Sequence, residues 1–492
     1  PPEPFAARYA DAPYLGEVAA TDAFLAPLLA PFLDGGQPPA LVVFTADHGE
    51  ALGDHGEQTH GLFAYEATLR VPLVLWGAGV LPGRDPRPAR HVDLLPTLLA
   101  AAGVEAPRGL PGAALTAPPA PAASWSYFEA LSANLNRGWA PLRGVMSGDR
   151  KAIELPLPEL YDLAADAGEE RNLVADDRPA ARQLFGLLTA ESSWPPPKAA
   201  ATSEEEAGLR SLGYVVGSAA PKSSYGPEDD PKRLVDLDGK LQQVIDLYSR
   251  RRLAEAERLA RDIVRARPSM GTGYSHLAQV LLEQDKRDEA IAVMDAAARR
   301  GLASEGLLRQ LGLTLAETGQ HARALDILRP PAERPEPDPS TLNAYGLALS
   351  EAGKQEEAAA VLRRAVAADP NNAVAYQHLS LVALRRRDWS AALDPARRAL
   401  DLNPELPLAW NNLGVARYST GDRDGALQAW ERAVQIDARQ FDTLFNLGFK
   451  AAEAGRVEQA RRVLRQFVDT APAARYRADI EQARALLERL GA

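Results

Sequence analysis

The stretch PLAWNNLGVARYSTGDRDGALQAWERAVQIDARQ, residues 407–440, decides the fold of the C-terminal half of the chain. When the sequence is shifted by the length of this stretch, it matches its neighbours on both sides. Alanine recurs at one position of the period, a dipeptide ending in glycine at a second, and proline near the end. The recurring residues are Ala256, Ala290, Ala324, Ala358, Ala392, Ala426 and Ala460; Leu311-Gly312, Tyr345-Gly346, Leu413-Gly414 and Leu447-Gly448; and Pro268, Pro370, Pro404 and Pro472.

Each recurring residue has a packing reason. The glycine and the alanine keep two helices of one period close together, because a larger side chain would push them apart. Proline ends the second helix, since it lacks an N–H and clashes with the preceding turn. The pattern and its period resemble the tetratricopeptide repeat (TPR). We therefore predict an all-α solenoid of seven repeats at residues 237–472, and a capping helix at 473–492 that covers the last apolar face.

Upstream of the repeats, residues 191–236 have the composition of a linker, with stiff Pro-rich and flexible Gly/Ser-rich segments. Residues 1–190 alternate helical and strand patterns and then carry shorter strands, which predicts an α/β domain with a small antiparallel appendage. The elements expected there are helices at 14–33 and 92–102 and strands at 41–44, 71–76, 125–129, 142–146 and 159–163.

Composition excludes several functions for this chain of 492 residues. Its net charge of −11 argues against a general nucleic-acid binder. The absence of cysteine excludes disulfides, Cys-ligated zinc and thiol nucleophiles. No run of about 18 apolar residues is present, so we expect no membrane span. The chain opens at Pro1 and its first methionine is Met146, so we expect it to begin within a longer protein. The localisation of that protein stays open, with export and membrane anchoring among the options.

The strongest chemical motif is Thr45-Ala46-Asp47-His48-Gly49-Glu50, which directly follows an apolar strand. The Asp47 carboxylate and the His48 imidazole are oxygen and nitrogen donors of the kind that hold a divalent cation. Glycine beside them allows a sharp turn and close approach to a ligand. The alternative is a turn of the same composition that binds nothing.

The flanks of this motif resemble the sulfatase family, in the alkaline phosphatase superfamily. The resemblance covers residues 5–215, and its motifs occur in the family's order. They are Leu52-Gly53-Asp54-His55-Gly56-Glu57, His60-Gly61, Tyr65-Glu66, Arg70-Val71-Pro72-Leu73, residues 92–99 (VDLLPTLL), residues 159–163 (ELYDL) and residues 209–214 (LRSLGY).

The resemblance implies a metal-dependent sulfuric ester hydrolase. Asp47 and His48 would be two ligands of a divalent cation, Ca²⁺ or in some branches Mn²⁺. His60 would contact the sulfate or act as general acid. The family's formylglycine nucleophile arises from Cys or Ser in a C/S-x-P-x-R motif, which is absent here. We expect it in an upstream half, so the site is incomplete and this chain alone is expected to show no sulfatase turnover.

Two other functions remain open. The domain could be a catalytically inactive sulfatase-like module that presents the repeats as a protein-interaction scaffold. It could also belong to a phosphonate or phosphodiester hydrolase of the same superfamily, which shares the Asp-His-Gly metal motif. A Cys-x-Pro-x-Arg upstream of Pro1 would support the sulfatase over the scaffold. Comparing an aryl sulfate with an aryl phosphonate as substrates of the restored enzyme would separate the two hydrolases.

The repeats themselves predict a groove for a protein or peptide partner. His378, Asn412 and Asn446 fall at the same position of three consecutive repeats. Stacked asparagines can clamp a peptide backbone through their amides, which resembles the asparagine ladder of some peptide-binding arrays. The alternative is ordinary polar surface on a helix face.

Overall fold

The computed structural model describes residues 1–33, 41–77, 80–85, 87–117, 125–188, 219 and 222–491. The chain divides into two compact units, which are treated separately below. The N-terminal unit is drawn from residues 1–134, 139–193 and 224–239. The repeat unit is drawn mainly from residues 240–492.

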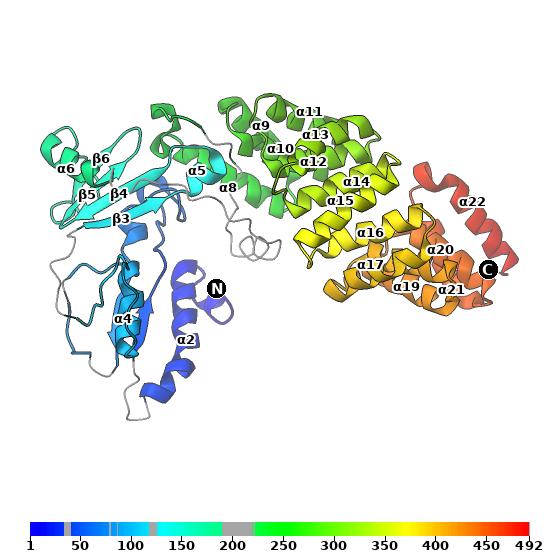
Figure 1. Cartoon of the computed structure of the whole chain (residues 1–492), viewed down its shortest axis with the longest axis horizontal. Helices are drawn as coiled ribbons and strands as arrows, with labels where there is room; N and C mark the ends of the chain where they lie inside the picture. The colour runs from blue at the N-terminus through cyan, green and yellow to red at the C-terminus, as the bar shows by residue number, and fades with distance from the viewer. Residues whose placement is uncertain are drawn as a thin grey trace. The chain divides into compact units, whose positions relative to one another are not determined.

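The repeat unit is a stack of antiparallel helix pairs, as the period of the sequence predicts (Figure 1). The first and second helices alternate along the chain. The helices are α8 (Val235–Ser249), α9 (Leu253–Ala266), α10 (Gly271–Glu283), α11 (Arg287–Arg299), α12 (Glu305–Glu317), α13 (His321–Ala332), α14 (Pro339–Glu351), α15 (Gln355–Ala368), α16 (Ala373–Arg385), α17 (Trp389–Leu402), α18 (Pro407–Ser419), α19 (Arg423–Ile436), α20 (Phe441–Glu453), α21 (Val457–Thr470) and α22 (Ala473–Arg489).

The recurring glycines lie where the two helices of a pair touch. A Cβ on Gly414 would lie 2.4 Å from Nε1 of Trp430, and one on Gly448 would lie 2.5 Å from Cδ2 of Leu464. Ala426 and Ala460, on the second helices, are completely buried. The predicted packing role of the small residues is therefore confirmed.

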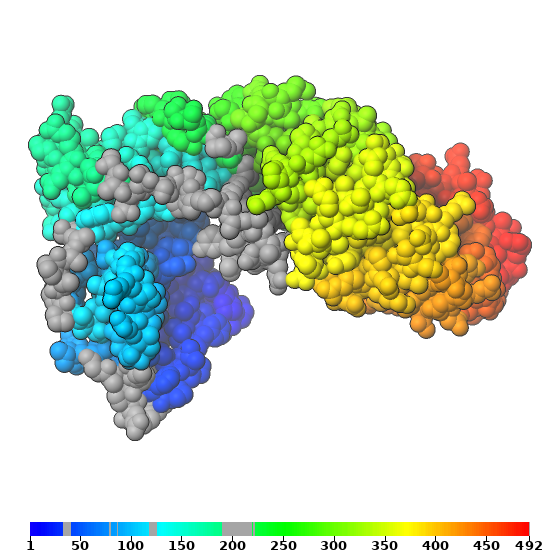
Figure 2. Space-filling view, in the orientation of Figure 1, coloured from blue at the N-terminus to red at the C-terminus, as the bar shows by residue number. Residues whose placement is uncertain are grey.

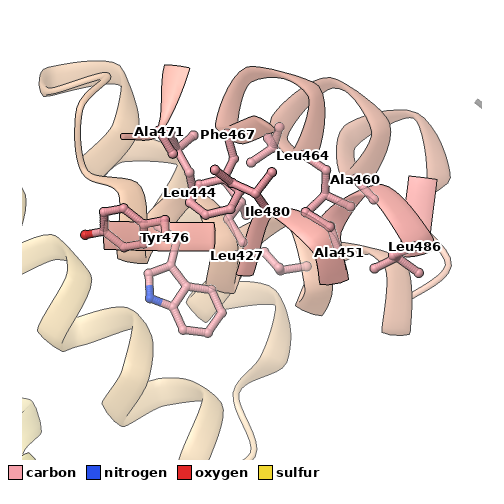
Figure 3. Close-up of a cluster of buried hydrophobic side chains, with 14 of the residues drawn as sticks. Leu427, Leu444, Ala451, Ala460, Leu464, Phe467, Ala471, Tyr476, Ile480 and Leu486 are labelled. Carbon is pink, nitrogen blue, oxygen red and sulfur yellow. The ribbon is translucent and has the colours of Figure 1, made fainter. Parts of the chain in front are cut away.

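Helix α22 packs on the last helix pair and shares one apolar cluster with it (Figure 3). Phe467 of α21 lies at the centre and is completely buried. Its ring meets Tyr476 of α22 edge-on, with the centroids 5.8 Å apart, and Phe445 of α20 at 5.6 Å. Ile480 and Leu486 of α22 are also buried in this cluster.

The N-terminal unit contains two sheets. The first is an antiparallel pair of short apolar strands, in which Val43 lies opposite Leu75. The second is a four-stranded antiparallel sheet in the order β3-β4-β5-β6. The strands are β1 (Val42–Thr45), β2 (Leu73–Trp76), β3 (Trp125–Ala130), β4 (Leu142–Ser147), β5 (Arg150–Glu154) and β6 (Glu159–Asp162). The helices are α1 (Phe5–Arg8), α2 (Pro13–Leu33), α3 (Glu66–Leu69), α4 (Leu94–Ala101), α5 (Ser132–Arg137) and α6 (Arg178–Leu188), with 3-10 turns η1 (Asp54–Gly56), η2 (His91–Asp93), η3 (Pro227–Asp229) and η4 (Pro231–Arg233).

The four-stranded sheet is the antiparallel appendage that the sequence predicts, with one strand more than expected. Strand β5 was not predicted, because Arg150 and Lys151 give it a polar pattern. One face of the sheet buries Val145, Ala152 and Leu160 against helix α6. The α/β character of this region is confirmed.

The predicted linker at 191–236 lies partly outside the described residues. Its last part, from residue 224, packs into the N-terminal unit. Asp229, Asp230 and Pro231 are buried there, and Asp230 accepts a hydrogen bond from the backbone N–H of Leu157 at 2.8 Å. Polar and proline-rich composition gave this segment the pattern of a linker, but its carboxylates find partners inside the unit.

Helix α2 is apolar yet largely solvent-exposed within its unit (Figure 2, blue). Phe24 and Leu28 are each 66% exposed. By length and composition, Pro13–Phe32 could cross a membrane, in contrast to our expectation that the chain has no such segment. Glu17, Thr21 and Asp22 interrupt the apolar run, so it escapes a search for uninterrupted runs.

Candidate functional site

The candidate site begins where β1 ends. Asp47 and His48 are the second and third residues after the strand, and the Asp47 side chain is 78% exposed. The His48 Nδ1 lies 3.0 Å from the carbonyl oxygen of Gly49. Because a carbonyl only accepts, Nδ1 is the donor, and Nε2 is the ring nitrogen that could bind a cation. Nε2 lies 3.5 Å from Oδ2 of Asp47, so the two predicted ligand atoms are adjacent.

The structure also brings His60 to this place. The His60 and His48 rings lie 4.0 Å apart between centroids. The Nδ1 of His60 donates to Oε2 of Glu50 at 3.1 Å, which directs the other ring nitrogen away from the carboxylate. Glu50 was not singled out from the sequence. The only indication in the sequence was that Glu50 lies in the same motif, two residues after His48.

A third histidine approaches from helix turn η2. The Nε2 of His91 lies 2.8 Å from the carbonyl oxygen of Ala46, so it fixes the backbone just before Asp47. Among the described residues, no three His, Asp or Glu side chains are grouped so that they could hold a metal ion. That Asp47 and His48 are metal ligands stays a prediction.

Gly49 is enclosed by the backbone of helix α3. Its N–H donates to the carbonyl of Thr68 at 2.7 Å. A Cβ on Gly49 would lie 2.3 Å from the carbonyl oxygen of Ala67. Glycine is required here because the chain passes too close to α3 for any side chain, and this contact holds the residue next to His48.

The loop between His48 and His60 is organised by a buried carboxylate. Glu57 is 2% exposed and accepts the backbone N–H groups of Leu62 and Phe63 at 2.6 and 3.2 Å. Burial raises the pKa of Glu57 to about 7, although the two N–H groups oppose the shift. The group is therefore a proton-binding residue of the loop near neutral pH.

Lys151, on strand β5, is completely buried. Its ammonium lies 2.8 Å from Oε1 of Glu169 and 3.2 Å from Oε1 of Glu66. His55 stacks on Tyr65, with the ring centroids 3.6 Å apart.

In the repeat unit, the three predicted groove residues differ in their surroundings. Asn412 is 4% exposed, and its amide donates to the backbone carbonyl of Gln377 at 3.0 Å. His378 Nδ1 pairs with Oδ1 of Asn343 at 2.8 Å. Both link neighbouring first helices. Asn446 is only half-buried. A peptide clamp by these residues stays a prediction.

We expect the repeat unit to lose stability as the pH falls below 6.5. Burial lowers the pKa of His378 to about 4, and nearby Arg385 adds to the shift, while Glu351 opposes it. The folded pKa is below the unfolded one, so the stabilisation is present above 6.5 and is lost as the pH falls toward 4, at about 1.4 kcal/mol per pKa unit. Urea unfolding at several pH values measures this. His378→Gln should remove most of the change in unfolding free energy between pH 6.5 and 4, whereas the control His321→Gln should leave it in place. If the unfolding free energy of His378→Gln falls with pH as steeply as that of the wild type, His378 is not the responsible group.

The sulfatase family model matches residues 2–104, and tetratricopeptide repeat models match residues 241–306, 307–373, 379–442 and 443–466. The chain therefore carries a sulfatase-like domain fused to TPR repeats. It is 32% identical over 141 residues to the uncharacterized sulfatase YidJ of Escherichia coli strain K12, covering 28% of each chain. It is 30% identical over 199 residues to arylsulfatase K of Danio rerio, covering 37% of each.

A choline-sulfatase of Rhizobium meliloti is 32% identical over 143 residues, and the match covers 28% of each protein. The chain thus spans about a third of the length of the curated relatives that it matches. Among solved structures, a TPR protein of Parabacteroides merdae is 14% identical, covers 52% of this chain and 98% of its own, and has a TM-score of 0.41. The Cut9-Hcn1 hetero-tetramer of APC/C is 16% identical, covers 52% of this chain and 51% of its own, and has a TM-score of 0.42.

Proposed function

We propose that the N-terminal unit is one wall of the active site of a metal-dependent sulfuric ester hydrolase, and that the TPR repeats hold it on a protein partner. The observation that carries this proposal is the meeting of Asp47, His48 and His60 at the end of β1, within a region that the sulfatase family model matches. These are the three residues that the family resemblance assigns to the cation and the sulfate.

Asp47 and His48 would hold the cation, Ca²⁺ or Mn²⁺, through a carboxylate oxygen and Nε2. The donors suit such an ion, but a hard cation takes six or more ligands, so further oxygens must come from elsewhere in the complete enzyme. When bound, the cation would stabilise negative charge on the sulfate oxygens. The ready exposure of the Asp47 carboxylate leaves room for those additional ligands.

His60 would act on the sulfate itself. Its Nδ1 is held by Glu50, so Nε2 is the nitrogen that can donate to a sulfate oxygen or to the leaving oxygen of the ester. Glu50 is thus a positioning residue for His60, a role comparable to that of the carboxylate in a histidine–carboxylate pair.

The ligand assignment can be tested without turnover. We expect Mn²⁺, added alone to the full chain, to broaden the NMR signals of the His48 ring. Asp47→Ala should abolish the broadening, because it removes one of two donors. Asp54→Ala is the matched control, since that carboxylate pairs with His55 instead and lies in the same loop. Equal broadening in the wild type and in Asp47→Ala would contradict the assignment.

Turnover by the chain alone tests the incompleteness of the site. The purified chain should not hydrolyse an aryl sulfate ester, since it has neither cysteine nor a C/S-x-P-x-R motif. Hydrolysis that Asp47→Ala abolishes would show the chain to be sufficient. The incomplete donor set also favours a second candidate, a catalytically inactive domain that presents the repeats. Mn²⁺ binding without turnover in the enzyme restored with an upstream half would favour that candidate.

The partner surface of the repeats would include a column of half-buried apolar residues at one position of successive first helices. These are Leu313, Leu347, Leu381, Val415 and Phe449, each one period after the last. Such a column suits a peptide with spaced apolar side chains.

A further inference from the structure

Lys151 provides a buried charge in the middle of the four-stranded sheet. It lies on β5, is completely buried, and its ammonium sits 5.3 Å from the centre of the Phe128 ring. An ammonium without water requires anionic partners. It has two, Glu169 at 2.8 Å and Glu66 at 3.2 Å. The cation therefore fixes the two carboxylates relative to the sheet.

The two carboxylates belong to different segments that meet at the start of α3. Glu66 is the first residue of this helix. Glu169 lies in the turn that follows β6, and its Oε2 accepts the backbone N–H of Glu66 at 2.5 Å. Glu169 thus binds Lys151 with one oxygen and the first N–H of α3 with the other. The start of α3 is attached to β5 through this pair.

The residue before α3 is attached to the same sheet independently. The hydroxyl of Tyr65 lies 3.2 Å from both carboxylate oxygens of Glu159, which also accepts from the hydroxyl of Tyr161 at 2.9 Å. Burial raises the pKa of both phenols, and the Glu159 charge adds to the effect, so each remains a neutral donor. Lys232 lies 3.5 Å from Glu159 and compensates its charge.

The other end of α3 contacts the motif. The carbonyl of Thr68 accepts the Gly49 N–H at 2.7 Å, and Ala67 leaves no space for a side chain on Gly49. Any displacement of α3 therefore moves the backbone next to His48. A continuous chain of contacts leads from Lys151 through Glu66 and Glu169 to this turn.

We infer that Lys151 is a positioning residue for the candidate site, which acts through α3 to hold His48 against His60. This inference rests on the proposed function only because that function gives the approach of His48 to His60 a catalytic purpose. On this view, the four-stranded sheet supplies the charge that fixes the start of α3, and α3 in turn fixes the turn at Gly49. Lys151 is not a catalytic residue.

The test is NMR of the full chain with isotope-labelled histidine. The sequence contains only 7 histidines, so their ring signals can be resolved. We expect the nuclear Overhauser contact between the His48 and His60 rings in the wild type, its loss in Lys151→Met, and its retention in Leu184→Ala. Leu184 is buried in α6 on the same sheet, outside the network, so its variant destabilises the unit without touching α3.

Retention of the contact in Lys151→Met, or its loss in both variants, would overturn the inference. If Lys151→Met does not fold, Glu66→Gln replaces it, since this carboxylate is 21% exposed and its neutral amide weakens only one of the two ion pairs. Weakening of the ring contact in Glu66→Gln supports the inference, and an unchanged contact overturns it. The readout needs neither cation nor substrate. Equal Mn²⁺ broadening in the wild type and in Asp47→Ala would therefore reject the proposed ligand assignment and leave this result standing.

Discussion

Phe467→Ala is expected to lower the unfolding free energy of the C-terminal end of the repeat unit by about 3 to 5 kcal/mol. The side chain is completely buried between α20, α21 and α22, and its ring contacts Phe445 and Tyr476. Alanine would leave a cavity that the three helices cannot all close. Because a repeat contacts only its neighbours, the loss should stay local to these helices.

Hydrogen exchange measured residue by residue distinguishes local from global loss. Protection should fall in α20–α22 and remain in α10–α13. Leu408→Ala is the control, because this leucine is 48% exposed and its truncation should change stability by no more than about 0.5 kcal/mol. An equal loss of protection along the whole array would contradict the expectation that the destabilisation stays within α20–α22.

Gly49→Ala is expected to destabilise the N-terminal unit by about 3 kcal/mol, at the upper end of the usual cost of overpacking. The added Cβ would lie 2.3 Å from a backbone oxygen of α3, which cannot rotate away as a flexible side chain could. Relief of the clash requires the turn to move, so the His48 and His60 rings should also separate.

Urea unfolding and the His48–His60 ring contact measure the two effects. Gly186→Ala is the matched control, because this glycine lies within helix α6 and, apart from the helix's own backbone, no atom of the described residues comes within 4 Å of an added Cβ. That variant should be neutral or more stable by about 0.5 to 1 kcal/mol, since alanine favours a helix. A stable Gly49→Ala with the ring contact intact would show that the turn can adapt.

The repeat fold was predictable because its information is local. Each helix pair is specified by residues within one period, and a glycine such as Gly414 faces a partner, Trp430, in the same helix pair. Strand β5 was missed for the opposite reason. The residues next to Lys151 in the sequence give no sign that it is buried. Its burial depends on the carboxylates of Glu66 and Glu169, which are not its sequence neighbours.

The site divides in the same way. Asp47, His48 and His60 were found because they lie in one short motif, and the structure brings them together. Glu50 was overlooked beside them. The anchoring of the motif by Tyr65 to Glu159 joins two distant parts of the sequence, and no local pattern reports such a pair. Lys151 could have been found only by asking which cation balances Glu66 and Glu169.

The period of the repeats also makes the length of the array a discrete quantity. Each junction between helix pairs repeats the same contacts, so excision of residues 339–372 would leave Ala324 followed by Ala392 at the original spacing, whereas excision of half that segment would join two helices of the same kind. Recombination within the gene can therefore shorten or lengthen the repeat surface in whole steps. The extent of that surface can then change while the geometry around Asp47 is left untouched.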